Sequence, residues 1–116
     1  MNLTKSEILG NVNYKNEQKV GHNTYKYQEI ETNYECIRYC KTDIITWFGG
    51  GKIILNSDGY KTVTTKKRMN EFQNIVYVYQ ENHTWYCSWN DGSIEDVEYF
   101  DGMVVDKNGL QSVAPY

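Results

Sequence analysis

The alternation of apolar and polar positions along this chain predicts short β-strands joined by polar turns. Two β-branched or aromatic runs, residues 44–48 and 52–55, flank three consecutive glycines that permit the positive φ of a hairpin turn. Residues 75–80 and 84–89 are rich in Val, Tyr and Trp and flank a short polar gap, which predicts a second hairpin. These runs favour a mostly antiparallel sheet.

Weaker patterns on either side extend this sheet. Residues 24–31 and 34–40 alternate less clearly and predict half-exposed strands, whereas the polar residues 16–23 before them predict a loop. Towards the C-terminus, residues 95–100 and 103–106 flank an Asp-Gly pair, which predicts a third hairpin.

One helix is predicted near the middle of the chain, after a turn formed by Asn, Ser, Asp and Gly. The side-chain oxygen of Thr64 or Thr65 is suited to cap a helix over residues 66–73. Met69 and Phe72 lie three positions apart, so they share one face of this helix and are expected to be buried.

Together these elements predict a single α+β domain over residues 1–116. Its mostly antiparallel sheet is expected to have about six to eight short strands, with one central helix packed across it. Thr4 and Glu7 have capping-box spacing, which predicts a further short helix at the N-terminus. Val63 is expected to pack as a staple before the cap of the central helix. The expected core is Ile44, Trp47, Ile53, Leu55, Val63, Met69, Phe72, Val76, Val78, Trp85, Cys87 and Val104.

Tyrosine and the distribution of charge are the unusual features of the composition. Eleven of the 116 residues are Tyr, which suits half-buried strand surfaces and is also enriched at recognition surfaces. Residues 1–80 carry eleven Lys or Arg and eight Asp or Glu, whereas residues 81–116 carry one Lys and seven acids. The two segments therefore have formal charges of +3 and −6. This balance disfavours indiscriminate binding to nucleic acid but permits a local basic site.

The start of the predicted helix is a candidate site for a phosphate or a partner. Amides at a helix N-terminus and threonine hydroxyls bind phosphate, cations neutralise it, and a tyrosine ring stacks on a base. The candidate residues are Tyr60, Lys61, Thr64, Thr65, Lys66, Lys67 and Arg68. The alternative is a capped helix with a solvated basic first turn.

The acidic C-terminal part is a second candidate, a docking face for a basic partner such as the nucleic-acid groove of a host enzyme. Its residues are Asp91, Glu95, Asp96, Glu98 and Asp101. Together with the tyrosine-rich sheet they suit a protein interface. The alternative is a solvated acidic surface that serves solubility.

No catalytic set, cofactor or metal site is predicted. Cys36, Cys40, His83 and Cys87 are residue types that bind zinc, but residues four apart on a strand are separated by about 13 Å, too far to share one ion. The sequence contains no phosphate loop, HExxH motif, nucleophile elbow or dinucleotide-binding glycine pattern. A small enzyme is therefore an alternative without positive support.

The odd cysteine count fits a reducing cytoplasm, and no apolar run has the length of a signal peptide or membrane span. A cytoplasmic protein without a membrane partner is expected.

The central stretch also resembles a signature of small bacteriophage and prophage proteins. That signature runs Leu-Asn-Ser/Thr-Gly-Gly-aromatic, then Thr-Val-Thr-Thr-Lys, then Arg-Met/Ile-Asn, and the resemblance covers about residues 36–86. The matching positions are Leu55, Asn56, Ser57, Gly59, Tyr60, Thr62–Lys66, Arg68, Met69 and Asn70, whereas Asp58 replaces the first Gly. The resemblance implies a phage accessory protein acting in the bacterial host.

By analogy with other small phage proteins, it further implies an inhibitor of host defence, of the anti-CRISPR type. We therefore expect a non-enzymatic binding protein that occludes a host protein, such as a defence nuclease, from its nucleic acid. The alternative is a small nucleic-acid-binding module that uses the basic start of the helix.

Overall fold

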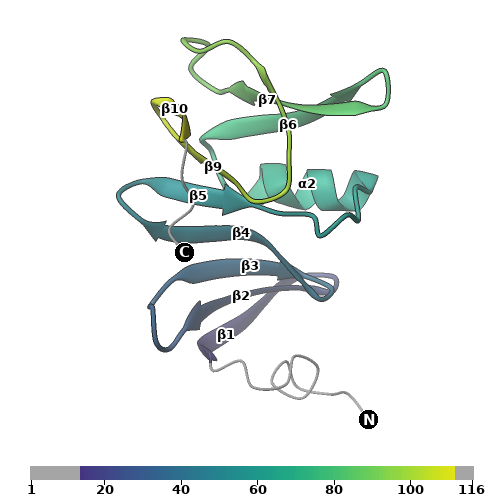
Figure 1. Ribbon diagram of the computed structural model, residues 1–116. Coiled ribbons are helices and arrows are strands. Elements are labelled where there is room, and N and C mark those ends of the chain that lie inside the picture. Colours follow the sequence, from purple (N-terminus) through teal and green to yellow (C-terminus); the bar gives the residue numbers. More distant parts are fainter. Residues whose placement is uncertain (1–13, 112–116) are drawn as a thin grey trace.

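The computed structural model describes residues 14–111, in which ten strands form two antiparallel sheets beside one helix (Figure 1). The helix α2 spans Val63–Phe72. The strands are β1 Tyr14–Gly21, β2 Thr24–Glu29, β3 Glu35–Tyr39, β4 Thr42–Gly49, β5 Lys52–Leu55, β6 Val76–Glu81, β7 Thr84–Trp89, β8 Val97–Glu98, β9 Met103–Asp106 and β10 Gly109–Gln111. The helix expected from Thr4 and Glu7 lies outside the described residues.

The large sheet has seven strands in the order β1-β2-β3-β4-β5-β9-β10. The first five strands are joined in sequence, so each pairs with its chain neighbour. After β5 the chain leaves the sheet, forms α2 and the small sheet, and returns as β9. The returning strand lies beside β5, with Ile53 opposite Val105 and Leu55 opposite Met103.

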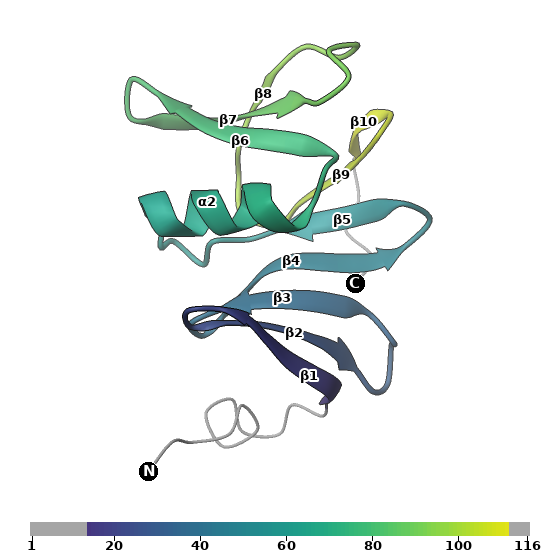
Figure 2. The same cartoon turned by 180° about the vertical axis from the view of Figure 1, so that it is seen from behind.

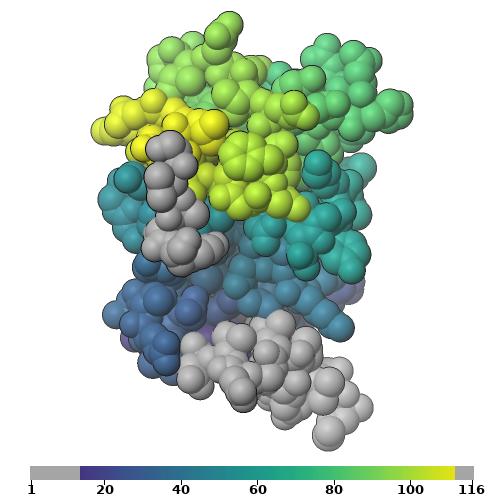
Figure 3. Space-filling model, in the orientation of Figure 1, coloured from purple at the N-terminus to yellow at the C-terminus, as the bar shows by residue number. Residues whose placement is uncertain are grey.

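The small sheet has three strands in the order β6-β7-β8 and lies on the far side of α2 from the large sheet (Figure 2). The helix contacts β6 on one side and β3 and β4 on the other. Figure 3 shows residues of the large sheet, in blue, towards one end of the described molecule and those of the small sheet, in green, at the other.

One apolar core joins the helix to both sheets. It buries the side chains of Ile37, Ile44, Ile45, Ile53, Leu55, Met69, Val76, Val78, Trp85, Cys87, Trp89, Tyr99, Met103 and Val105. Trp47 and Phe72 are partly buried against this cluster. Burial of large apolar side chains is the main stabilising term for such a fold, at about 1.5–3 kcal/mol per fully buried residue.

The predicted α+β class is wrong, because the described fold is dominated by strands and has two sheets rather than one. The strands were predicted from local alternation, which does not reveal their partners. The β6–β7 hairpin has an apolar face of its own, formed by Val76, Val78, Trp85, Cys87 and Trp89. This face packs in the common core with Met69 of α2 and Met103 of β9, so the hairpin forms a separate sheet instead of extending the large one.

The predicted hairpins at residues 44–55 and 75–89 are confirmed as β4–β5 and β6–β7. The third predicted hairpin is wrong. Residues 97–98 pair with β7, whereas β9 pairs with β5 and β10. The predicted loop at residues 16–23 is also wrong, because β1 extends to Gly21. Its exposed, polar edge position removes the apolar alternation that identifies a strand.

The helix begins earlier than predicted. Its N-cap is Thr62, whose side chain accepts a hydrogen bond from the Thr65 amide, so neither Thr64 nor Thr65 is the cap. The predicted staple is wrong, because Val63 is the first helical residue and 75% of its side chain is exposed.

Candidate functional site

Asp101 holds the turn that precedes the helix. Its carboxylate accepts hydrogen bonds from the Ser57 amide at 2.8 Å, the Ser57 hydroxyl at 2.7 Å and the Gly59 amide at 2.9 Å. It also accepts a hydrogen bond from the Tyr99 hydroxyl at 2.6 Å. Partial burial opposes ionisation, but these donors prevail and lower the pKa of Asp101. This predicted docking residue therefore connects two segments of the chain.

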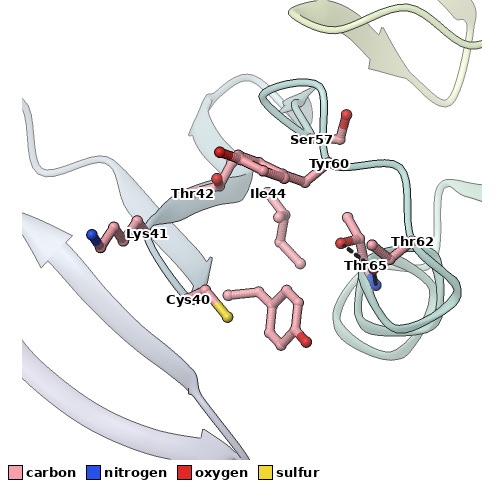
Figure 4. Close-up of a pocket in the computed structure, with 9 residues that line it drawn as sticks. Cys40, Lys41, Thr42, Ile44, Ser57, Tyr60, Thr62 and Thr65 are labelled. Carbon is pink, nitrogen blue, oxygen red and sulfur yellow. Dashed lines mark hydrogen bonds between the residues drawn. The ribbon is translucent and has the colours of Figure 1, made fainter.

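The threonines at the helix start are bonded to each other. The hydroxyls of Thr62 and Thr65 lie 2.9 Å apart, and Thr65 is buried. A pocket of about 350 Å³ opens beside them (Figure 4). Thr62 and Thr65 line it from the helix side, and Cys40 and Ile44 line it from β4 and the turn before it. Its walls are mostly apolar, so it is not a phosphate cradle.

The cations of the helix start make separate contacts within the chain. Lys61 lies over the Tyr99 ring with its Nζ atom 5.7 Å from the centroid, and Lys66 lies 5.6 Å from the Trp85 centroid. Arg68 pairs with Glu71 at 3.2 Å. Thr64 is half-buried, whereas Tyr60 and Lys67 are exposed. The helix start therefore distributes its positive charge over several contacts, which weakens the case for one phosphate-binding site.

The outer face of the small sheet carries a group of aromatic rings. Along β6 and β7 the side chains alternate, and those opposite the buried core are Tyr77, Tyr79 and Tyr86. The rings of Tyr77 and Tyr79 are 6.5 Å apart with a 13° interplanar angle, and those of Tyr79 and Tyr86 are 5.6 Å apart at 27°. The three rings form one stacked row.

Carboxylates border this row of rings. The Tyr79 hydroxyl donates a hydrogen bond to Asp96, which raises the pKa of Tyr79 to about 12. Glu98 lies opposite Tyr86 in the β7–β8 register. We call the surface formed by Tyr77, Tyr79, Tyr86, Asp96 and Glu98 the tyrosine face. It combines one exposed ring, that of Tyr77 at 55%, and two half-buried rings with two negative charges.

The segment of the sequence that forms the tyrosine face carries charges of one sign. Between Arg68 and Lys107 the sequence has eight Asp or Glu residues and no Lys or Arg. Of the predicted acidic docking residues, Asp96 and Glu98 belong to this face, and Glu95 is exposed in the segment that leads into β8. Asp91 instead bonds the amide and hydroxyl of Ser93 in its own turn, and these bonds lower its pKa.

The sequence predicts the acids of this surface as docking residues but does not single out its rings. The alternation along the hairpin places Val76, Val78, Trp85 and Cys87 on one face. It places Tyr77, Tyr79 and Tyr86 on the opposite face. The missing information was which side of the hairpin faces the core, because either alternating set is able to form a buried face.

The three cysteines lie at different places in the fold. Among residues 14–111, no three His, Cys, Asp or Glu side chains are grouped closely enough to hold an ion. Cys36 and Cys87 are buried, which raises their pKa to about 11 and about 12, and Cys40 is exposed at the β3–β4 turn. The buried thiols are therefore protonated at neutral pH and serve as small core side chains.

The helix in the described part of the chain is too short and too polar to cross a membrane. A family model described as Kyanoviridae Gp96 protein matches residues 2–106. No curated protein and no solved structure matches the chain.

Proposed function

Because the chain belongs to the Kyanoviridae Gp96 family, a family of phage proteins, we propose that it is a non-enzymatic accessory protein that binds a host protein. The tyrosine face is the surface that carries this proposal. It presents three stacked rings, and tyrosine provides large, rigid contact area with little loss of conformational entropy on binding.

The charge of the tyrosine face indicates the kind of host surface it fits. Negative charge repels nucleic acid and attracts a basic surface. The carboxylates that provide it here are Asp96, Glu98 and the nearby Glu81 and Glu95. Basic surfaces on intracellular proteins commonly bind nucleic acid. We therefore propose that the protein occludes a nucleic-acid-binding surface of a host protein in the bacterial cytoplasm. A defence nuclease is the proposed target, which makes the protein an anti-defence inhibitor of the anti-CRISPR type.

The experiment is a capture from host lysate followed by competition. The tagged full chain is incubated with lysate with and without nuclease treatment, the captured protein is identified, and its affinity for nucleic acid is measured with and without the phage protein. We expect one nuclease-resistant partner whose nucleic-acid binding is inhibited. The variant Asp96→Lys with Glu98→Lys should lose both capture and inhibition.

A matched control has the same change of charge elsewhere. Glu17 and Glu31 are exposed on the large sheet and its first loops, so Glu17→Lys with Glu31→Lys should capture the partner normally. Loss of capture in both variants would show that net charge, not the tyrosine face, controls binding. Nuclease-sensitive recovery that is abolished by Lys66→Glu with Lys67→Glu would instead support the nucleic-acid-binding module.

A further inference from the structure

We infer that the tyrosine face recognises arginine side chains at alternate positions of an extended segment of the partner. This inference rests on the proposed function, since it specifies the chemistry of the surface that the partner presents. It follows from the spacing of the rings, from the chemistry of the groups beside them and from the hydrogen bonds that already occupy the edge of β6.

The spacing of the rings matches the repeat of an extended chain. Tyr77 and Tyr79 are alternate residues of β6, and their ring centroids are 6.5 Å apart. Alternate residues of any extended strand are separated by about 6.6 Å, from a rise of about 3.3 Å per residue. A partner segment that runs along β6 therefore places one side chain from every second position against each ring.

The chemistry of the tyrosine face favours arginine over lysine. A guanidinium is planar and weakly hydrated, so it stacks on an aromatic ring while its N–H groups bind a carboxylate. Asp96 provides such a carboxylate at the edge of the Tyr79 ring. Its Oδ2 atom accepts the hydrogen bond from Tyr79, and no hydrogen bond within residues 14–111 uses its Oδ1 atom. The ammonium group of lysine lacks the planar set of N–H donors with which a guanidinium stacks on the ring and binds the carboxylate at the same time.

The partner segment binds over the face rather than as an added strand. The outer edge of β6 is already occupied by one side chain of α2 and by that of its C-cap residue. Asn70 bonds both the amide and the carbonyl of Val78, and Gln73 does the same for Val76. Strand addition at this edge would require these bonds to break, whereas side chains are free to reach the rings from above.

Three synthetic peptides test the inference on the full chain. Each has three cationic residues and serine spacers: arginines at alternate positions, lysines at alternate positions, and arginines with irregular spacing. Binding is measured by isothermal titration and by NMR shifts of the tyrosine rings. The alternating arginine peptide should bind about fivefold more tightly than the alternating lysine peptide, which corresponds to about 1 kcal/mol of stacking. It should also bind more tightly than the irregular arginine peptide.

Two variants locate the binding. Tyr77→Leu with Tyr79→Leu should remove the preference for arginine, while Ile30→Ala, at an exposed apolar residue of the β2–β3 turn, should retain it. Circular dichroism and thermal melting establish that both variants are folded. Equal affinity for the arginine and lysine peptides, absence of binding, or an unchanged preference in the folded tyrosine variant would overturn the inference.

The outcome for the peptides is separable from the outcome for the proposed function. Capture of a partner that depends on Asp96 and Glu98, without any preference for arginine peptides, would retain the proposed function and overturn this inference. A clear arginine preference without inhibition of a host protein would support this inference about the tyrosine face and count against the proposed function.

Discussion

Asn70 and Val78 are joined by two hydrogen bonds in which a side-chain amide replaces a neighbouring β-strand. The Nδ2 atom of Asn70 donates to the Val78 carbonyl at 2.9 Å, and its Oδ1 atom accepts from the Val78 amide at 2.8 Å. Gln73 repeats the arrangement at Val76. The helix thus satisfies the open edge of the small sheet and blocks pairing with another chain there.

Asn70→Asp should destabilise the fold, because it removes the donor and places a carboxylate oxygen near the Val78 carbonyl. We expect a loss of about 1–3 kcal/mol in the free energy of unfolding, measured by urea denaturation at neutral pH. Asn74→Asp is the matched control, since the Asn74 side chain is exposed and Asn74 accepts the hydrogen bond from Asn90 through its backbone carbonyl. A similar loss in both variants would contradict a specific role for the Asn70 amide.

Asp101→Asn should loosen the turn before the helix at neutral pH. The carboxylate accepts bonds from Ser57, Gly59 and Tyr99, and an amide cannot accept all of them. Because Asp101 is partly exposed, we expect a loss of only about 1 kcal/mol in the free energy of unfolding.

The effect of Asp101→Asn on the free energy of unfolding should also depend on pH. The pKa of Asp101 is lowered in the folded protein. The carboxylate therefore makes its full contribution to the free energy of unfolding above the pKa of the unfolded state, about 3.9. The contribution is lost as the pH falls through the folded pKa. The difference in stability between wild type and Asp101→Asn should therefore be constant from pH 7 to 5 and shrink below pH 4. A constant difference down to pH 2 would assign the effect to packing.

Several of these contacts show why the sequence predicted the strands but not their arrangement. Gly49–Gly51 and the polar gap at residues 81–83 specify hairpins locally, and both hairpins formed. The pairing of β9 with β5 depends on residues about fifty positions apart, which no local pattern reveals. Asp101 illustrates the same limit, because its sequence neighbours suggest a free acid while its partners include Ser57 and Gly59.

The candidate site was also predictable only in part, because the sequence shows which residues are charged but not which residues lie together in the fold. Charge is a property of composition, so the acidic segment was evident from the sequence. Locating the tyrosine face required knowing how the β6–β7 hairpin packs on the core, which buries one side of the hairpin and leaves Tyr77, Tyr79 and Tyr86 on the other. The cationic helix start was evident in the sequence, but the rings of Tyr99 and Trp85 beneath Lys61 and Lys66 were not.

Asp96→Asn should lower the pKa of Tyr79 from about 12 towards the ordinary value of about 10. The hydrogen bond to the Asp96 carboxylate is the largest cause of the raised value, because it stabilises the protonated phenol and the charge opposes the phenolate. The pKa is measured by NMR titration with ring-labelled tyrosine. Glu98→Gln should leave the Tyr79 pKa close to that of the wild type. Equal effects of the two variants would contradict a specific Tyr79–Asp96 bond.

Arg38 makes a buried ion pair with Asp43 at 2.8 Å and donates a hydrogen bond to the Tyr27 hydroxyl at 2.7 Å. Only 5% of Arg38 is exposed, so Arg38→Leu leaves the charge of Asp43 and the Tyr27 hydroxyl without their cationic partner. We expect a loss of about 3 kcal/mol in the free energy of unfolding, measured by urea denaturation. The double variant Arg38→Leu with Asp43→Leu should recover part of that loss, because it removes both charges together. Additive losses from the two substitutions would show that packing of the arginine side chain, and not the ion pair, sets the cost.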